Sequence, residues 1–254
     1  MNRSRVRYGH LICLSLLASV LFVAQSSVAA PQTATYQLTF DATWSAITHP
    51  VGFPSGPHFS GLIGGTHNNQ ASFWAPGANA SAGIEAMAET GSKSPLDAEV
   101  QAAINSGNAG MIISGGGIGV SPGSVSVTLT VSQQHSKITV VSMIAPSPDW
   151  FVGVHDLELF ENGAWINSKV VALLPYDSGT DSGVNYSSPN QDTNPQDPIS
   201  LINSGGVGNG VPLGNFTLVR TDAVPATTPA ALAIGAALVL LLGLSLLAMR
   251  LGRA

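Results

Sequence analysis

The sequence predicts an all-β fold, an antiparallel β-sandwich with long loops and one or two short helices. Apolar and polar residues alternate with a period of two in several segments, as they do in half-buried strands. Stretches rich in Gly, Ser, Asn and Pro separate these segments, and such stretches are typical of loops. Antiparallel sheets that each bury one face produce this alternation, so two packed sheets are the expected architecture.

Six segments are expected to form strands, at 36–44, 125–131, 138–145, 151–160, 165–174 and 215–220. The third is more continuously apolar and changes phase at Val140-Val141, which indicates a bulge. Asn162-Gly163 is a strong hairpin signal between the fourth and fifth segments, so these two are expected to form a hairpin.

Two short helices are expected. Ser94 resembles an N-cap followed by Pro95 at the first helical position, which predicts a helix to about Ile104. Residues 84–90, followed by Gly91, form the second candidate. The expected long loops cover residues 50–83, 105–123 and 178–214.

Residues 1–30 are typical of a secretory signal peptide. Three arginines, at positions 3, 5 and 7, precede an apolar region at 11–24, and Val28-Ala29-Ala30 supplies the small residues of a cleavage site. We therefore expect the protein to be exported.

The C-terminal end predicts a membrane anchor. After a linker at 223–229, residues 230–249 form an uncharged run long enough to cross a bilayer, and Arg250 and Arg253 place the tail 250–254 in the cytoplasm. Val224-Pro225, the apolar run and the arginine tail resemble the PEP-CTERM sorting signals of Gram-negative bacteria, although Ala226-Thr227 stands where that family has Glu-Pro. The protein is thus expected in the cell envelope, anchored or secreted after C-terminal processing.

The exported part, residues 31–222, has the length of one domain and is strongly acidic. Four cations (Lys93, Lys137, Lys169 and Arg220) against 14 carboxylates give it a formal net charge of −10. Such a surface disfavours nucleic acid and anionic lipid, and it favours cations or basic partners. This part has no cysteine, so its stability rests on the apolar core.

Three carboxylates point to a metal site. Asp149 lies in one short Pro/Ser loop, and Asp177 and Asp181 lie in a second, with Gly179 between them. Carboxylates without cationic neighbours repel one another, so a fold that gathers them usually supplies a cation. Calcium, which takes about six to eight oxygen ligands, is the expected ion. The alternative is three solvated carboxylates that cap turns.

Two other chemistries use the same residue types. Residues 177–180, Asp-Ser-Gly-Thr, fit the Asp-Ser/Thr-Gly-Ser/Thr motif that carries the catalytic aspartate of aspartic proteases. That mechanism needs two such motifs, because two aspartates share one proton, and the chain has one. His49, His58 and His67 recur at intervals of nine, which are not the short intervals of zinc motifs. Two alternatives to a binding module stay open: an envelope hydrolase that acts on glycan or peptide, and a purely structural surface component.

The chain resembles the spondin domain, the module from the N-terminal half of F-spondin that also occurs in single-domain bacterial proteins. The resemblance covers roughly residues 34–200. It rests on Trp44-Ser45, Thr48-His49-Pro50, Phe53-Pro54, His58-Phe59-Ser60, His67-Asn68, Trp74, Gly83, Ser142-Met143, Pro146-Ser147-Pro148-Asp149-Trp150, Val152-Gly153, Trp165, Asp177-Ser178-Gly179-Thr180-Asp181-Ser182-Gly183, Pro189 and Pro195.

The resemblance implies a sandwich similar to the calcium-and-lipid-binding domain of protein kinase C. It also implies a calcium ion held by Asp149, Asp177 and Asp181. Ser178 stands where the family has Ala and adds a hydrogen-bonding hydroxyl. The expected function is a non-enzymatic, envelope-anchored calcium-binding module for adhesion or matrix assembly, whose partner is an extracellular protein or glycan.

Overall fold

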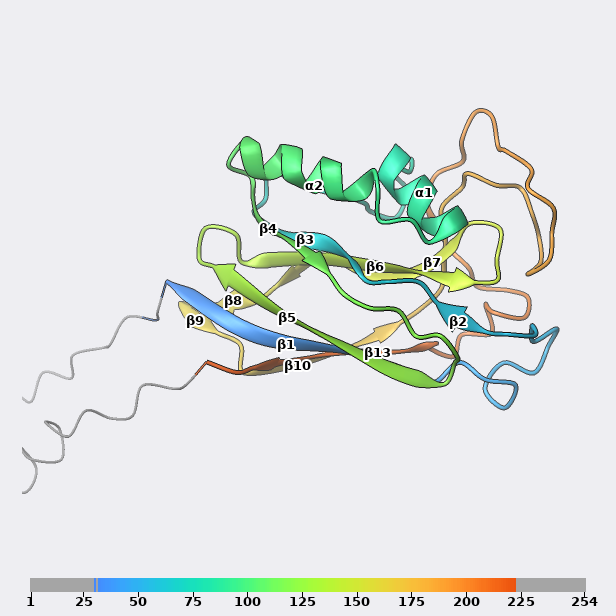
Figure 1. The fold of residues 1–254 in the computed structure, drawn as a ribbon, viewed down its shortest axis with the longest axis horizontal. Helices are drawn as coiled ribbons and strands as arrows, with labels where there is room; N and C mark the ends of the chain where they lie inside the picture. Colours follow the sequence, from blue (N-terminus) through green and yellow to red (C-terminus); the bar gives the residue numbers. More distant parts are fainter. Residues whose placement is uncertain (1–29, 31, 223–254) are drawn as a thin grey trace, which may run out of the picture.

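The computed structural model describes residues 30 and 32–222, which form a β-sandwich with two helices packed on one sheet (Figure 1). The strands are β1 (Thr33–Ala42), β2 (His58–Phe59), β3 (Ile63–His67), β4 (Ala109–Ser114), β5 (Gly123–Ser132), β6 (Lys137–Ala145), β7 (Trp150–Glu158), β8 (Phe160–Glu161), β9 (Ala164–Trp165), β10 (Ser168–Leu173), β11 (Tyr176–Asp177), β12 (Ser200–Leu201) and β13 (Gly214–Arg220), and the helices are α1 (Ala82–Thr90) and α2 (Leu96–Asn105).

The strands form two main sheets, and every pairing within them is antiparallel. The smaller sheet has the order β10-β13-β1-β5, and the larger has the order β12-β11-β7-β6-β3-β4, with β2 also paired to β6. The predicted antiparallel β-sandwich is therefore confirmed.

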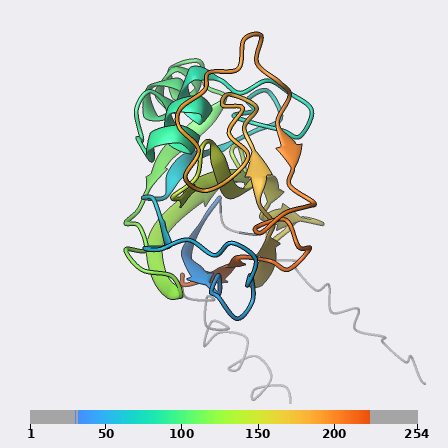
Figure 2. The ribbon, with the colours of Figure 1, turned by 90° about the vertical axis from the view of Figure 1, so that its right-hand side faces the viewer.

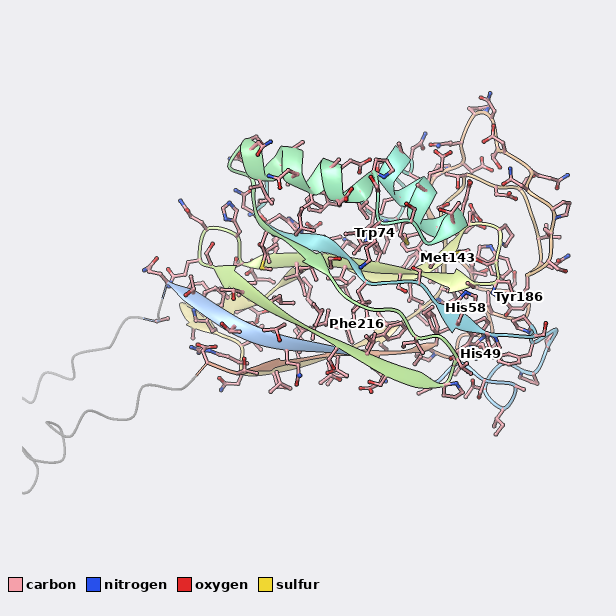
Figure 3. All side chains as sticks on the ribbon, in the orientation of Figure 1. His49, His58, Trp74, Met143, Tyr186 and Phe216 are labelled. Carbon is pink, nitrogen blue, oxygen red and sulfur yellow. The ribbon has the colours of Figure 1, made fainter. Side chains whose placement is uncertain are left out.

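The larger sheet is covered on both faces. Its inner face packs against the smaller sheet around residues such as Phe216, and its outer face packs against the helices around Trp74 and Met143 (Figure 3). Strand β6 alternates between these two cores: Val140 belongs to the first and Val141 to the second. Burial on both sides explains the continuous apolar run in this segment.

The bulge expected at Val140-Val141 lies elsewhere. The register between β6 and β7 shifts between Ile138 and Val140, and the extra residue is on β7. There Asp156 has a φ of 51°, a left-handed conformation that a bulge accommodates. Adjacent apolar residues in β6 reflect its two covered faces and not a change of phase.

Strands β3 and β4 lie in stretches that were expected to be loops. All five residues of β3 are buried, and two of them are glycines, so the segment lacks the alternation of a half-buried strand. A Cβ at Gly64 would lie 1.9 Å from the carbonyl oxygen of Thr139, and one at Gly65 would lie 2.6 Å from a methyl of Val100. Close approach by β6 and α2 therefore selects glycine at these two positions.

The predicted hairpin is only partly correct. Asn162-Gly163 forms the expected two-residue turn, with both residues at positive φ, but it connects only the short strands β8 and β9. The flanking long strands do not pair with each other, because β7 pairs with β6 and β11 whereas β10 pairs with β13. The chain thus changes sheets at this turn.

Both expected helices are present. The Ser81 side chain caps α1, and Gly91 ends it with a φ of 70°. Helix α2 begins one residue later than expected, since Pro95 occupies the cap position and no side chain caps this end. Ser94 therefore does not serve as the predicted N-cap.

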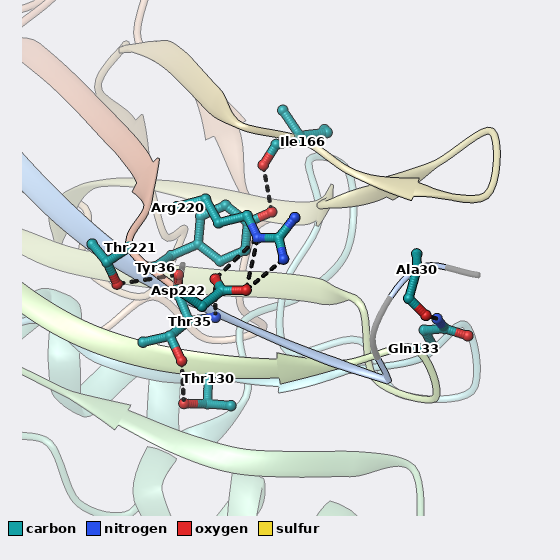
Figure 4. Close-up of polar contacts among 9 residues, drawn as sticks. All are labelled: Ala30, Thr35, Tyr36, Thr130, Gln133, Ile166, Arg220, Thr221 and Asp222. Atoms are coloured by element: carbon teal, nitrogen blue, oxygen red, sulfur yellow. Dashed lines mark hydrogen bonds and ion pairs between the residues drawn. The ribbon is translucent and has the colours of Figure 1, made fainter. Parts of the chain in front are cut away.

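The two ends of the described chain meet at one end of the sandwich (Figures 1 and 4). Asp222 pairs with Arg220 and also accepts a hydrogen bond from the backbone N–H of Thr35 at 2.9 Å. The buried hydroxyl of Tyr36 donates to the carbonyl of Ile166 at 2.6 Å, and burial raises the pKa of Tyr36 to about 12. These contacts fix the last residues of the domain opposite the long loops.

Within residues 30 and 32–222, no helix is both long and apolar enough to cross a membrane. The predicted signal peptide (apart from Ala30), linker, anchor and tail lie outside the described residues.

A substitution pair tests the close approach at β3. Gly64→Ala is expected to lower the free energy of unfolding by about 3 kcal/mol, because the new methyl overlaps backbone atoms of β6 that cannot move aside. Gly119→Ala is the control, since a Cβ there meets no atom within 4 Å. Urea denaturation of both variants measures the difference, and equal midpoints would contradict the packing described.

Candidate metal centre

The predicted metal ligands lie at the end of the sandwich where the long loops gather, which faces the viewer in Figure 2. Asp149 immediately precedes β7, and Asp177 ends β11. These two strands pair with Asp177 opposite Trp150, so residues 27 apart in the sequence lie side by side. The sheet therefore brings the two predicted loops together.

The carboxylate of Asp149 is completely buried, with 0 % exposure. Its Oδ2 atom accepts hydrogen bonds from the Ser178 hydroxyl at 2.9 Å and from the backbone N–H groups of Thr180 at 2.9 Å and Asp181 at 3.1 Å. Ser178 thus makes the additional hydrogen bond expected from its hydroxyl. The other oxygen, Oδ1, is buried and has no hydrogen-bond partner.

Asp177 and Asp181 each accept hydrogen bonds from nearby backbone. Asp177 Oδ1 accepts from the N–H of Gly179 at 2.8 Å, and the oxygens of Asp181 accept from Gly183 at 2.6 Å and from Gln191 at 2.8 Å. A carboxylate oxygen has two lone pairs, so these bonds leave acceptor capacity on both side chains.

Burial and, next to it, the negative charge of Asp149 raise the pKa of Asp177 to about 6. The N–H of Gly179 acts in the opposite direction, as does the indole of Trp150. The Trp150 indole is therefore near Asp177, but its buried N–H does not reach hydrogen-bond geometry with any partner. An acidic group at this position holds a proton more tightly than a solvated one, because burial and a neighbouring carboxylate both disfavour its charged form.

Gly179 shapes the second loop. Its φ is 75°, and a Cβ there would lie 2.0 Å from the carbonyl oxygen of Asp197. Only glycine combines this backbone conformation with such a close approach. The turn at Gly179 directs the N–H groups of Thr180 and Asp181 toward Asp149.

A fourth acid, Glu89, was not among the predicted site residues. It lies in the last turn of α1, and burial raises its pKa, with further contributions from the charges of Glu85, Asp149 and Asp181. The hydroxyl of Thr180 lowers the same pKa, so Glu89 adjoins the second loop. A glutamate just before the glycine that ends a helix opposes the helix dipole, and this was the available sequence signal.

The acids adjoin one another but do not form a preformed metal cage. Among the residues that the structure describes, no three His, Cys, Asp or Glu side chains converge closely enough to hold an ion as they stand. The residues nevertheless fit calcium, since hard oxygen donors are present and the buried Asp149 Oδ1 lacks any partner.

A cavity of about 450 Å³ adjoins these acids. Asp177, Asp181 and Asp197 line it, together with apolar atoms of Trp150, Ile202 and Val207. Trp150 is 7 % exposed, and its ring contacts Tyr186, whose ring in turn contacts Trp44. The aromatic core of the sandwich thus supports one wall of the cavity.

The three histidines considered for zinc do not form a cluster in the described part of the chain, and each has its own hydrogen-bond partners. His49 bonds to Thr48 and to the carbonyl of Val211, His58 bonds to the carbonyl of Gly56, and His67 bonds to Thr139. His49 and His58 appear at the loop end in Figure 3. Each imidazole holds a loop or strand in place.

The titration of Asp177 provides a test of this geometry. In calcium-free protein, carbon-13 NMR of the carboxyl group is expected to give a pKa of about 6 for Asp177. Asp197→Asn is expected to lower this pKa, because it removes a nearby negative charge. Asp41→Asn, on the outer face of the smaller sheet, is the control and should leave the value unchanged. A pKa of 3.8 in the parent protein would contradict the burial described here.

Comparisons with known proteins identify the family of this chain. The family model described as Spondin_N matches residues 34–208. Spondin-2 of Homo sapiens is 34% identical over 228 residues, which cover 85% of this chain and 68% of spondin-2. Spondin-1 of Rattus norvegicus is 37% identical over 181 residues, which cover 68% of this chain and 22% of spondin-1. This chain therefore belongs to the spondin N-terminal domain family.

Proposed function

We propose that this protein is an exported, calcium-binding adhesion or matrix module held in the cell envelope, and that it is not an enzyme. Membership of the spondin family supports a module of the extracellular-matrix or adhesion type. The signal-peptide pattern at residues 1–30 supports export. The observation that carries the calcium assignment is the buried, unpartnered Oδ1 atom of Asp149.

Calcium explains this atom better than water or a basic side chain does. A buried carboxylate oxygen without a partner is costly, and a cation offsets that cost directly. Three of the four Lys and Arg residues in the described chain are engaged elsewhere: Lys93 with Ser114, Lys169 with Glu161 and Arg220 with Asp222. The fourth, Lys137, begins β6, whereas Asp149 follows the other end of that strand. In this proposal Asp149, Asp177 and Asp181 hold the ion, and Glu89 adds negative charge beside it.

The alternative functions have less support. A hydrolase needs a second group that acts as acid or base on a bound substrate. Asp177 has the raised pKa of such a group, but its nearest charged neighbours are further carboxylates and its proton is explained by burial. A structural surface component in which calcium only stabilises the fold is the second alternative, and it predicts no ligand at the loop end.

Calcium is expected to stabilise the folded protein. Extracellular sites of this kind have dissociation constants on the order of 10⁻⁴–10⁻³ M. Calcium at about tenfold above the constant contributes about 1.4 kcal/mol, because it binds only the folded state. This corresponds to a rise in melting temperature of roughly 3–6 °C for a domain of this size. Differential scanning calorimetry in calcium and in chelator measures it.

Matched variants assign the effect to residues. Asp181→Asn is expected to reduce the calcium-dependent rise, Glu89→Gln is expected to weaken it less, and Asp41→Asn is the surface control. An identical melting temperature with calcium and with chelator in the parent protein would falsify the metal assignment.

Anchoring by residues 230–249 has a separate test. Deleting residues 224–254 is expected to release the protein into the periplasm or medium, because the apolar run is the proposed stop-transfer segment. Cell fractionation followed by immunoblotting compares the deletion with the full chain. If the deleted form still fractionates with membranes, the anchor assignment is wrong and the β-sandwich itself mediates attachment.

A further inference from the structure

The 450 Å³ cavity beside the acids has the size and lining of a small-molecule site. Its volume is in the range of natural small-molecule sites, and it combines apolar walls with a few polar groups. The residues that line it come from segments far apart in the sequence: the start of β7, the 177–184 loop and the 193–207 segment. One wall carries the indole ring of Trp150, whose N–H is itself buried.

The charge around the cavity selects against anionic ligands. Asp177, Asp181 and Asp197 line it, whereas no Lys, Arg or His does so. Asp149 and Glu89 lie behind this wall and add to the same negative field. One divalent ion neutralises only two of five carboxylates, so an acidic peptide or acidic sugar would still meet net repulsion.

The polar groups match the hydroxyls of a neutral sugar. Each hydroxyl can donate to a carboxylate and still offer an oxygen to a hard cation. Apolar parts of the lining, among them Ile202 and the ring of Trp150, suit the C–H face of a pyranose ring. An apolar or anionic ligand would satisfy only part of this set.

We infer that this cavity binds a neutral glycan through neighbouring hydroxyl groups, in a calcium-dependent manner. The inference rests on the proposed calcium site and extends it to the class of ligand. In this inference Asp177, Asp181 and Asp197 accept hydrogen bonds from the sugar hydroxyls. The bound calcium ion keeps the 177–184 loop in the conformation that forms the cavity wall. A protein ligand at this cavity is the competing outcome.

The test uses the purified full-length protein on columns of immobilised mannan, galactan and dextran. In millimolar calcium the protein is expected to be retained on at least one column and to be released by chelator. Calcium binding is measured separately by isothermal titration with calcium chloride alone, and a column of immobilised polyglutamate serves as the acidic probe.

Ser204→Phe tests the cavity without touching the acids. Ser204 is an exposed residue of the cavity wall, and a phenyl group there narrows the space available to a ligand. We expect the affinity for the retaining glycan to fall at least about tenfold, while the calcium titration stays unchanged. Ser126→Phe, an exposed position on the outer face of the smaller sheet, is the matched control and should retain the parent affinity.

The outcomes separate the two proposals. If calcium binds but none of the three neutral columns retains the protein, the glycan inference is overturned and the calcium assignment stands. Retention on polyglutamate alone, or retention that Ser204→Phe leaves unchanged, also overturns it. If calcium itself does not bind, the proposed function fails, and the inference fails with it.

Discussion

The loop end of this protein is organised around one buried carboxylate. Asp149 Oδ2 accepts bonds from the Ser178 hydroxyl and two backbone N–H groups of the 178–181 segment, so one oxygen atom gathers three donors of that segment. The other oxygen, Oδ1, has no partner. A buried oxygen without a partner is costly, and this cost is the reason for proposing a cation beside it.

The burial of the larger sheet on both faces brings the remaining groups to this carboxylate. Helix α1 packs on the outer face, which places Glu89 beside Thr180. Strand β11 pairs with β7, which places Asp177 opposite Trp150. The acidic cluster therefore depends on the packing of sheet and helices as much as on its own loops, and its residues come from three separate parts of the chain.

The sequence predicted those features that local pattern controls. The half-buried strands β1, β5 and β13 alternate with a period of two, and α1 carries a clear glycine stop, so all four were predictable. Strand β3 was not, because burial on both faces and two close backbone approaches replace alternation with glycine. The three aspartates were found from loop composition and family resemblance, whereas Glu89 was missed because only tertiary packing brings a helix terminus to these loops.

In the proposed calcium site, a proton and the cation would compete for the carboxylate of Asp177. The pKa of Asp177 is raised to about 6 in the folded protein, above its ordinary value of 3.8, so between these values the folded state binds a proton that the unfolded state has lost. Stability from this group is present at low pH and is lost as the pH rises through that window. Above it, the ionised carboxylate is a cost to the ion-free fold, and in the proposed site it would be a ligand for calcium. If calcium binds as proposed, neutral and alkaline surroundings favour the calcium-bound form, and acidic surroundings favour release.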